Sequence, residues 1–264
     1  MDRLDNKKIV IMGGTTGMGL SAARAFVENG AQVVVVGRHE ASVAMAQQEL
    51  GKRCVAQTGD AILPGTAQKA IDRCMAAFGG FTGLYHVAGG SGRRMGDGPL
   101  DELTLEGWNR TLELNLTSLM LSNQAAVRNF LAHKTPGTIL NISSVLGFAP
   151  SPAFFSTHAY AAAKSAVWGF SRSVASCYAK DNIRVNVLAP SLIDTPMAKR
   201  ATGDETILSF IRTKQPLDQG RIGQPEDLDG LAVYFMSDQS RFTTGQLVAV
   251  DGGWSISDGQ IPIE

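Results

Sequence analysis

One tyrosine and one lysine stand four residues apart in a stretch of small residues, and both side chains can carry or hold a proton. Tyr160 and Lys164 lie in the run His-Ala-Tyr-Ala-Ala-Ala-Lys-Ser-Ala. If this run is helical, residues four apart share one face, and the ammonium comes close to the phenol. A nearby positive charge favours the phenolate and lowers the tyrosine pKa from about 10 towards neutrality. The pair therefore predicts acid/base chemistry on an alcohol or carbonyl oxygen.

The segments around this pair alternate between short β-branched runs and longer helical patterns, which is typical of βαβ units. The run Val33–Val36 shows most clearly that the strands are almost continuously apolar, as in a parallel sheet covered by helices on both faces. We expect strands at about 8–12, 32–37, 54–58, 83–87, 137–143, 184–189 and 246–250. We expect helices at about 17–29, 41–50, 66–78, 108–133, 158–180, 204–214 and 225–236. Without a linker or a shift in composition, residues 1–264 predict a single α/β domain of the doubly wound Rossmann type.

A glycine-rich turn joins the first expected strand to the first expected helix. It reads Met-Gly-Gly-Thr-Thr-Gly-Met-Gly from Met12 to Gly19. Glycines allow a tight turn and a close approach of pyrophosphate, and the helix start offers free N–H groups. Dinucleotides bind at this first strand-to-helix turn in doubly wound sheets, so the turn predicts a cofactor cradle. The residues expected to contact the cofactor here are Gly13, Thr15, Thr16, Gly17, Met18 and Gly19.

The glycine spacing and a series of further motifs, in order along nearly the whole chain, resemble the short-chain dehydrogenase/reductase family. This resemblance implies seven parallel strands in the order 3-2-1-4-5-6-7 and a nicotinamide cofactor. The motifs are Gly13-x-x-x-Gly17-x-Gly19, Asp60 after the third strand, Ala88-Gly89, Asn115 in Leu-Asn-Leu, the serine strand 141–147, Tyr160-x-x-x-Lys164, and the late segments 221–227 and 244–253.

The resemblance also implies roles for four residues of the site. Tyr160 is the general acid or base, and Lys164 lowers its pKa and holds the nicotinamide ribose. Asn115 braces a water near Lys164, although its amide could instead satisfy helix backbone at a bend. Ser143 and Ser144 are adjacent at a strand end, so only one should face the site. The family pattern Ser-x-x-Gly selects Ser144 to polarise the substrate oxygen.

The end of the second strand bears on the choice of cofactor. An acid there would accept from the ribose 2′-OH, whereas a cation would favour a 2′-phosphate. Arg38 follows the strand and no acid occupies its end, so we expect NADP(H), with NAD(H) as the alternative. The chain departs from the family pattern at Met12, at His86-Val87 and at Ser191. The further residues expected to contact the cofactor are Arg38, Asp60, Ala61, Ala88, Gly89, Tyr160, Lys164, Pro190, Ile193 and Thr195.

Composition excludes several other classes of protein. Of 264 residues 44% are apolar and 18% charged, and the formal net charge is zero, so no overall field attracts nucleic acid or a membrane surface. We expect no signal peptide and no membrane span. Three unpaired cysteines indicate buried reduced thiols and a cytoplasmic protein. The four histidines lack metal-ligand spacing, so we expect no metal.

The leading prediction is therefore an NADP(H)-dependent oxidoreductase that interconverts a secondary alcohol and a ketone, including an oxoacyl thioester. The alternatives are an NAD-dependent dehydrogenase of a sugar, polyol or steroid-like alcohol, and a nucleotide-binding sensor without turnover. Arg93 and Arg94 either meet an anionic substrate group or belong to a solvated loop. Residues at about 190–215 are expected to form a lid over a small substrate. The resemblance implies a homotetramer or homodimer.

Overall fold

Seven parallel strands form the centre of the computed structural model, which describes residues 3–152 and 154–259. Their order is β3-β2-β1-β4-β5-β6-β7, so the predicted fold class and strand order are confirmed. All six neighbouring pairs are parallel, with Ile9 opposite Val33 and Leu84 opposite Ile139 as examples of the register. The strands are β1 (Lys8–Met12), β2 (Gln32–Gly37), β3 (Cys54–Thr58), β4 (Gly83–His86), β5 (Gly137–Ile142), β6 (Ile183–Pro190) and β7 (Leu247–Val250).

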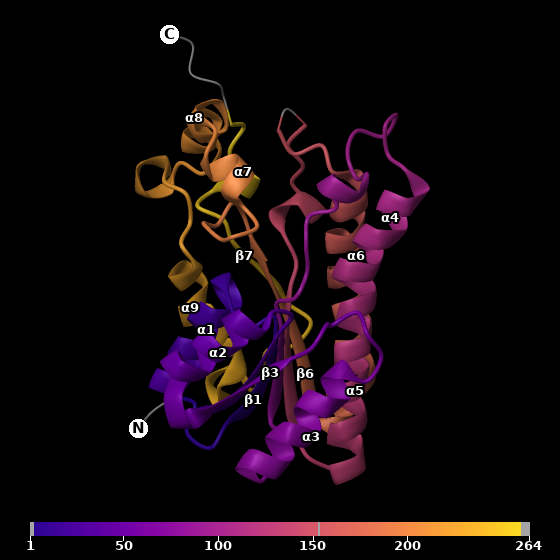
Figure 1. Ribbon diagram of the computed structural model, residues 1–264, viewed down its shortest axis with the longest axis vertical. Helices are drawn as coiled ribbons and strands as arrows, with labels where there is room; N and C mark the ends of the chain where they lie inside the picture. Colours follow the sequence, from indigo (N-terminus) through magenta and orange to yellow (C-terminus); the bar gives the residue numbers. More distant parts are fainter. Residues whose placement is uncertain (1–2, 153, 260–264) are drawn as a thin grey trace.

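Helices cover both faces of the sheet (Figure 1). One face carries α1 (Gly17–Glu28), α2 (Glu40–Leu50) and α9 (Asp229–Met236). The other carries α3 (Thr66–Phe78), α5 (Ser118–His133) and α6 (His158–Tyr178). Beyond the carboxyl ends of the strands lie α4 (Leu105–Leu112) and the short pair α7 (Lys199–Thr202) and α8 (Glu205–Lys214).

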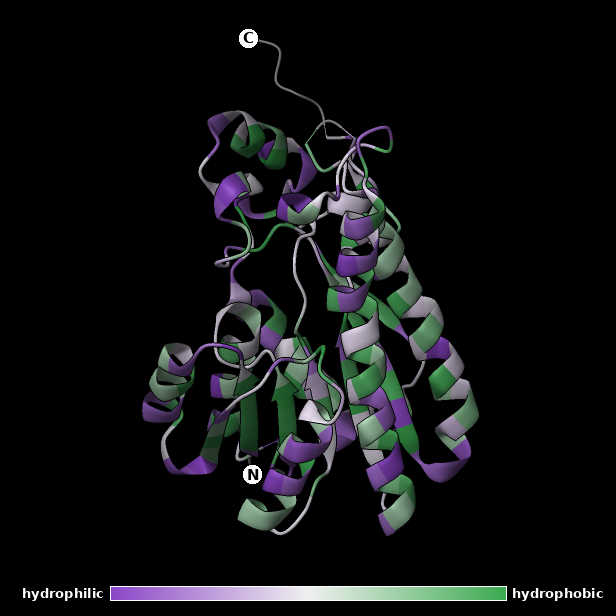
Figure 2. Cartoon of the chain, turned by 45° about the vertical axis from the view of Figure 1, so that its right-hand side comes forward, coloured by the Kyte–Doolittle hydropathy of each residue, from purple (hydrophilic) through white to green (hydrophobic). Residues whose placement is uncertain are grey.

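The core consists of two apolar layers, one on each side of the sheet. In β1, Ile9 and Ile11 pack with the α1 layer, whereas Val10 and Met12 pack with the α3 layer. This alternation follows from the two-residue repeat of a strand, and residues 9–12 of β1 are buried on both faces of the sheet. Figure 2 shows the strands mostly in the hydrophobic colour, between helices that mix both colours. The sheet is therefore a rigid base whose carboxyl edge can hold a site.

Three expectations about local structure need correction. The expected helix over 108–133 begins at Leu105 and is interrupted by one π-helical turn, Glu113–Thr117. The expected helix over 225–236 begins as a 3₁₀ turn, Pro225–Leu228. Cys54 and Cys74 are buried as expected, but Cys177 is exposed because it lies on the outer side of α6.

Among the residues described, no helix is long and apolar enough to cross a bilayer.

Candidate active site

Two adjoining cavities open at the carboxyl edge of the sheet. The first has a volume of about 550 Å³ and contains the tyrosine and lysine of the sequence pattern. The second has a volume of about 410 Å³ and contains the glycine-rich turn. Because seven residues line both, the two cavities form one continuous trough; these are Met18, Val87, Gly89, Gly90, Thr195, Pro196 and Met197.

The glycine-rich turn adopts a conformation that depends on its glycines. Gly13 and Gly17 have φ of +84° and +52°, a region that other residues avoid. A Cβ at Gly19 would lie 2.0 Å from the carbonyl oxygen of Gly13. Gly19 is therefore a close-packing residue and, unlike its five predicted companions in the turn, lines neither cavity.

The start of α1 offers the chemistry that a pyrophosphate needs. The N-cap residue Thr16 makes no side-chain hydrogen bond to the helix, and the first turn contains no acidic residue. The first N–H groups of a helix have no intrahelical acceptor and carry a partial positive charge. Since Thr15, Thr16 and Met18 line the second cavity, these groups fit a dinucleotide phosphate.

The far end of the second cavity contains the residues predicted to choose the cofactor. Strand β2 ends at Gly37, where a Cβ would lie 2.1 Å from Thr15 Oγ1. The exposed Arg38 follows and lines the cavity together with Asp60 and Ala61. No carboxylate stands at the β2 end, in contrast to a site built for a free 2′-OH.

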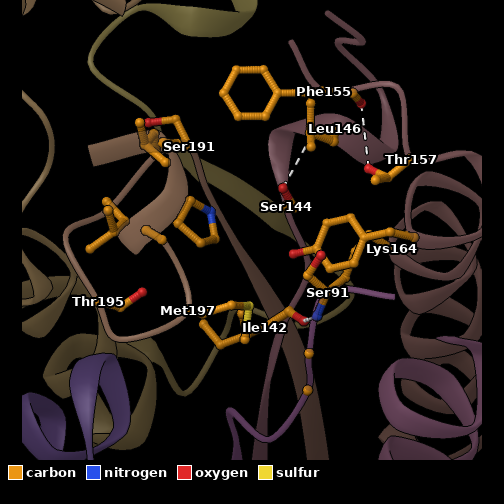
Figure 3. A pocket seen from close by; sticks show the side chains of 18 of the residues that line it. Ser91, Ile142, Ser144, Leu146, Phe155, Thr157, Lys164, Ser191, Thr195 and Met197 are labelled. Atoms are coloured by element: carbon orange, nitrogen blue, oxygen red, sulfur yellow. Dashed lines mark hydrogen bonds between the residues drawn. The ribbon is translucent and has the colours of Figure 1, made fainter. Parts of the chain in front are cut away.

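Tyr160 and Lys164 occupy successive turns of α6 and line the first cavity, where Figure 3 labels Lys164. The Lys164 ammonium lies 5.6 Å from the Tyr160 ring centroid and donates to the carbonyl oxygen of Ile142 at 3.0 Å. Only 4% of Lys164 is exposed. Because burial disfavours the charged form, the pKa of Lys164 falls to about 8.

In the structure of the chain alone, the pKa of Tyr160 is raised, so the prediction that it is lowered is wrong. Burial raises the pKa of Tyr160 to about 12, and the hydrogen bond with Ser144 opposes this rise only in part. The Lys164 ammonium, which lies over the Tyr160 ring at 5.6 Å from its centroid, does not reverse the effect of burial. At neutral pH the phenol is therefore protonated and able to donate.

The two adjacent serines have different partners. Ser143 donates its hydroxyl to the carbonyl oxygen of Lys164 at 2.6 Å and so ties β5 to α6. Ser144 interacts with Tyr160 and accepts from the N–H of Leu146 at 3.3 Å (Figure 3). Glycine at position 147 lets the turn after Ser144 pack closely against α6, because a Cβ there would lie 2.8 Å from the backbone nitrogen of Ser165. Ser144 is thus the serine whose hydroxyl accompanies the phenol.

Asn115 sits in the π-helical turn and connects that turn to the loop after β4. Its amide nitrogen donates to the carbonyl oxygens of Gly90 at 2.8 Å and Thr111 at 2.9 Å. Its amide oxygen accepts from the N–H of Gly90 at 3.1 Å. A Cβ at Gly89 would be 2.7 Å from that oxygen and 3.6 Å from Lys164 Nζ, so Asn115 adjoins the lysine. The alternative role at a helix bend is realised, and the water relay remains a prediction.

Asp97 is a residue of the site that the sequence did not single out. It is 4% exposed, and its two carboxylate oxygens accept from the N–H groups of Ala159 at 3.0 Å and Tyr160 at 2.9 Å. The N-cap residue Thr157 makes no side-chain bond to the helix. Asp97 therefore caps α6 from a loop about 60 residues earlier and fixes the backbone of Tyr160. No local signal marks it, because the contact is entirely tertiary.

His86 lies beneath the site, where the family pattern has an asparagine. It is buried, and its Nε2 lies 3.5 Å from Ser118 Oγ. Burial, and secondarily the Lys164 charge, lower the pKa of His86 to about 3, so it is neutral. No cluster of potential metal ligands occurs within residues 3–152 and 154–259.

The structure brings together nearly all predicted site residues. Apart from Gly19, each one lines at least one of the two cavities, as follows: Asn115, Ser144, Tyr160, Lys164, Pro190 and Ile193 in the first, Gly13, Thr15, Thr16, Gly17, Arg38, Asp60, Ala61 and Ala88 in the second, and Met18, Gly89 and Thr195 in both.

Comparisons with known proteins agree with this geometry. Residues 13–255 match a family model described as enoyl-(acyl carrier protein) reductase. An NADP-dependent (R)-specific alcohol dehydrogenase of Lentilactobacillus kefiri is 35% identical over 96% of this chain and 98% of its own length. A cis-4-hydroxycyclohexanecarboxylate dehydrogenase of Sinomonas cyclohexanicum is 33% identical over 93% and 95%. The solved structure of a short-chain type dehydrogenase/reductase from Mycobacterium ulcerans has a TM-score of 0.88 at 29% identity and covers 97% of this chain and 92% of its own.

Proposed function

Because the chain belongs to the short-chain dehydrogenase/reductase family, we propose that it interconverts a ketone and a secondary alcohol with NADP(H) as the hydride carrier. Relatives at this level of identity are dehydrogenases that act on CH–OH groups, and the chain is an oxidoreductase of that kind. One observation carries the finer proposal. The Tyr160 phenol, with the Ser144 hydroxyl and the Lys164 ammonium, lines the first cavity, which is continuous with the second cavity at the glycine-rich turn.

In this proposal the chain's own residues bind the substrate oxygen and supply its proton, while the bound nicotinamide supplies or accepts the hydride. Ser144 donates a hydrogen bond to the carbonyl oxygen and polarises it. Tyr160, protonated at neutral pH because its pKa is about 12, transfers its proton to the same oxygen. Lys164 is the nearest cation and stabilises the phenolate that remains.

The residues that would hold the cofactor follow from the two cavities. The start of α1 would receive the pyrophosphate, and Asp60 and Ala61, which line the same cavity, would contact the adenine end of the cofactor. Arg38 would pair with a 2′-phosphate, which supports NADP(H) over NAD(H). The similarity to an NADP-dependent relative supports the same choice.

The substrate is small, in keeping with a cavity of about 550 Å³. The names of the relatives support a secondary alcohol or ketone, and the matching family model leaves an acyl thioester as the alternative. We further propose that residues 190–215 act as a lid. Assembly into a homodimer or homotetramer and a cytoplasmic location remain predictions from the family and from the cysteines.

The test is a panel of ketones, secondary alcohols and oxoacyl thioesters, assayed with NADPH and NADH by nicotinamide absorbance. The proposal predicts turnover of at least one carbonyl, with higher kcat/KM for NADPH. Equal efficiency with both nucleotides would contradict the cofactor choice. Tight nucleotide binding without turnover of any panel member would favour the nucleotide-binding sensor instead.

A further inference from the structure

The first cavity has an uneven distribution of charge. Five cationic side chains line it, namely Arg93, Arg94, Lys164, Lys199 and Arg200. No carboxylate lines it among the described residues, although the chain as a whole contains 24 acidic and 24 basic residues. The imbalance is therefore local, and it creates a positive potential inside a concave site.

Two of these cationic side chains, Arg93 and Arg200, donate hydrogen bonds to the same carbonyl oxygen. Arg93, from the loop after β4, donates to the carbonyl oxygen of Phe154 at 3.0 Å. Arg200, from α7, donates to the same oxygen at 3.2 Å. The guanidinium groups are therefore close neighbours, and each keeps further N–H donors.

Nothing within the described part of the chain neutralises this pair. Neither guanidinium makes an ion pair within 4.0 Å, in contrast to Arg24, Arg110 and Arg221 elsewhere. Asp97 is the acid that acts on Arg93, but both of its oxygens accept from the start of α6. Burial, and then the neighbouring Arg200, lower the pKa of Arg93, which indicates an unmet electrostatic demand.

The wall between this pair and the reacting groups is aromatic and apolar. Phe155 packs edge-on against Trp254 at 5.4 Å between centroids, and Leu146 lines the same cavity. Figure 3 shows Phe155 and Leu146 beyond Ser144 on the cavity side. The Arg200 guanidinium lies 6.0 Å from the Phe155 ring centroid. The site thus offers a hydrogen-bonding end at Ser144 and Tyr160, an apolar middle and a cationic end.

We propose that the substrate is an oxo acid or hydroxy acid whose carboxylate binds Arg93 and Arg200 while its carbonyl or hydroxyl oxygen meets Ser144 and Tyr160. This inference rests on the proposed function. Arginine binds carboxylates in a fork geometry, and an apolar skeleton between the two polar ends suits the aromatic wall. The phosphates of a coenzyme A thioester are the other source of negative charge that these two arginines could bind.

Binding of non-reacting probes separates this inference from turnover. Calorimetry with cyclohexanecarboxylate and with the neutral cyclohexanecarboxamide should give at least about tenfold tighter binding of the carboxylate, as expected for charge-assisted hydrogen bonds. The difference should disappear in Arg93→Gln and Arg200→Gln, whose amides can still donate to Phe154. It should persist in Arg212→Gln, which removes an exposed charge of α8 outside the cavity lining. Equal binding of both probes, or equal loss in the control, would overturn the proposal.

Turnover gives the second arm, with a keto acid and its neutral ester as matched substrates. For reduction by NADPH, the ratio of kcat/KM between the acid, 4-oxocyclohexanecarboxylate, and its methyl ester should fall about 10- to 100-fold in Arg93→Gln, mainly because the acid binds more weakly. A higher kcat/KM for acetoacetyl-coenzyme A than for the keto acid would overturn the carboxylate assignment and leave the proposed function intact. Failure of every carbonyl would instead count against the proposed function, while the calorimetry would still decide the charge preference.

Discussion

Replacement of Asp97 by alanine should damage the start of α6 and, with it, the position of Tyr160. The change removes both acceptors that serve the N–H groups of Ala159 and Tyr160. Hydrogen bonds to a charged group contribute about 1.5 to 3 kcal/mol each, and Thr157 can recover part of the loss by turning to cap the helix. We therefore expect a loss of about 2 to 3 kcal/mol in the free energy of unfolding. For a chain of this size that corresponds to a fall in Tm of about 5 to 10 °C.

The assay compares Asp97→Ala with Asp101→Ala, which removes an exposed acid of the same loop. Calorimetric Tm should fall only in the first variant, and Asp97→Asn, which keeps one acceptor, should be intermediate. Since Tyr160 is the third residue of α6, kcat should fall about tenfold or more while the Kd for NADPH changes little. A Tm and kcat for Asp97→Ala equal to those of Asp101→Ala would refute the capping role.

Three further changes have defined outcomes. Arg38→Ala should lower the ratio of kcat/KM with NADPH to kcat/KM with NADH about tenfold, because the exposed guanidinium that would pair with the 2′-phosphate is removed. An unchanged ratio would show that Arg38 does not contact the cofactor. Burial raises the pKa of Asp229 to about 6. Between about pH 4 and 6 the carboxyl is therefore protonated in the folded state but ionised in the unfolded state, and the free energy of unfolding falls as the pH rises through this range. Asp229→Asn should therefore stabilise the protein by about 1 to 3 kcal/mol at pH 7.5 and by little at pH 4, as measured by urea unfolding; equal effects at both pH values would contradict the cause. Because the Tyr160 pKa is about 12, alcohol oxidation should rise with pH from 7 to 9 by up to about tenfold per unit while ketone reduction stays nearly level; a flat oxidation profile would point to another base.

The sheet and the trough could be predicted because their signals are local. The apolar run of β2 and the glycines of the β1–α1 turn depend on short segments, and the structure has β2 at the predicted 32–37. Strand alternation predicts that only one of Ser143 and Ser144 faces the site, and the family pattern selects Ser144; the two hydroxyls do have different partners. The direction of a side chain within one strand or one turn can thus be predicted from its neighbours in the sequence.

The remaining features depend on contacts between distant segments. Asp97 reaches α6 across about 60 residues, and the Arg93 and Arg200 side chains both donate to the carbonyl oxygen of Phe154. Asn115, in the π-helical turn, donates to the carbonyl oxygen of Gly90, a contact that helix propensity does not predict. The raised pKa of Tyr160 could not be predicted for the same reason, since the spacing of four residues indicates the nearby Lys164 but not the burial of the phenol.

The Tyr160→Phe variant tests the central claim most directly. Its kcat for ketone reduction with NADPH should fall by about 10² to 10⁴, the contribution of a positioned proton donor, with the Kd for NADPH preserved. Tyr234→Phe, a phenol outside both cavities, should keep the original rate. We expect the loss of kcat in Tyr160→Phe and not in Tyr234→Phe; ketone reduction at the original rate by Tyr160→Phe would rule out Tyr160 as the proton donor.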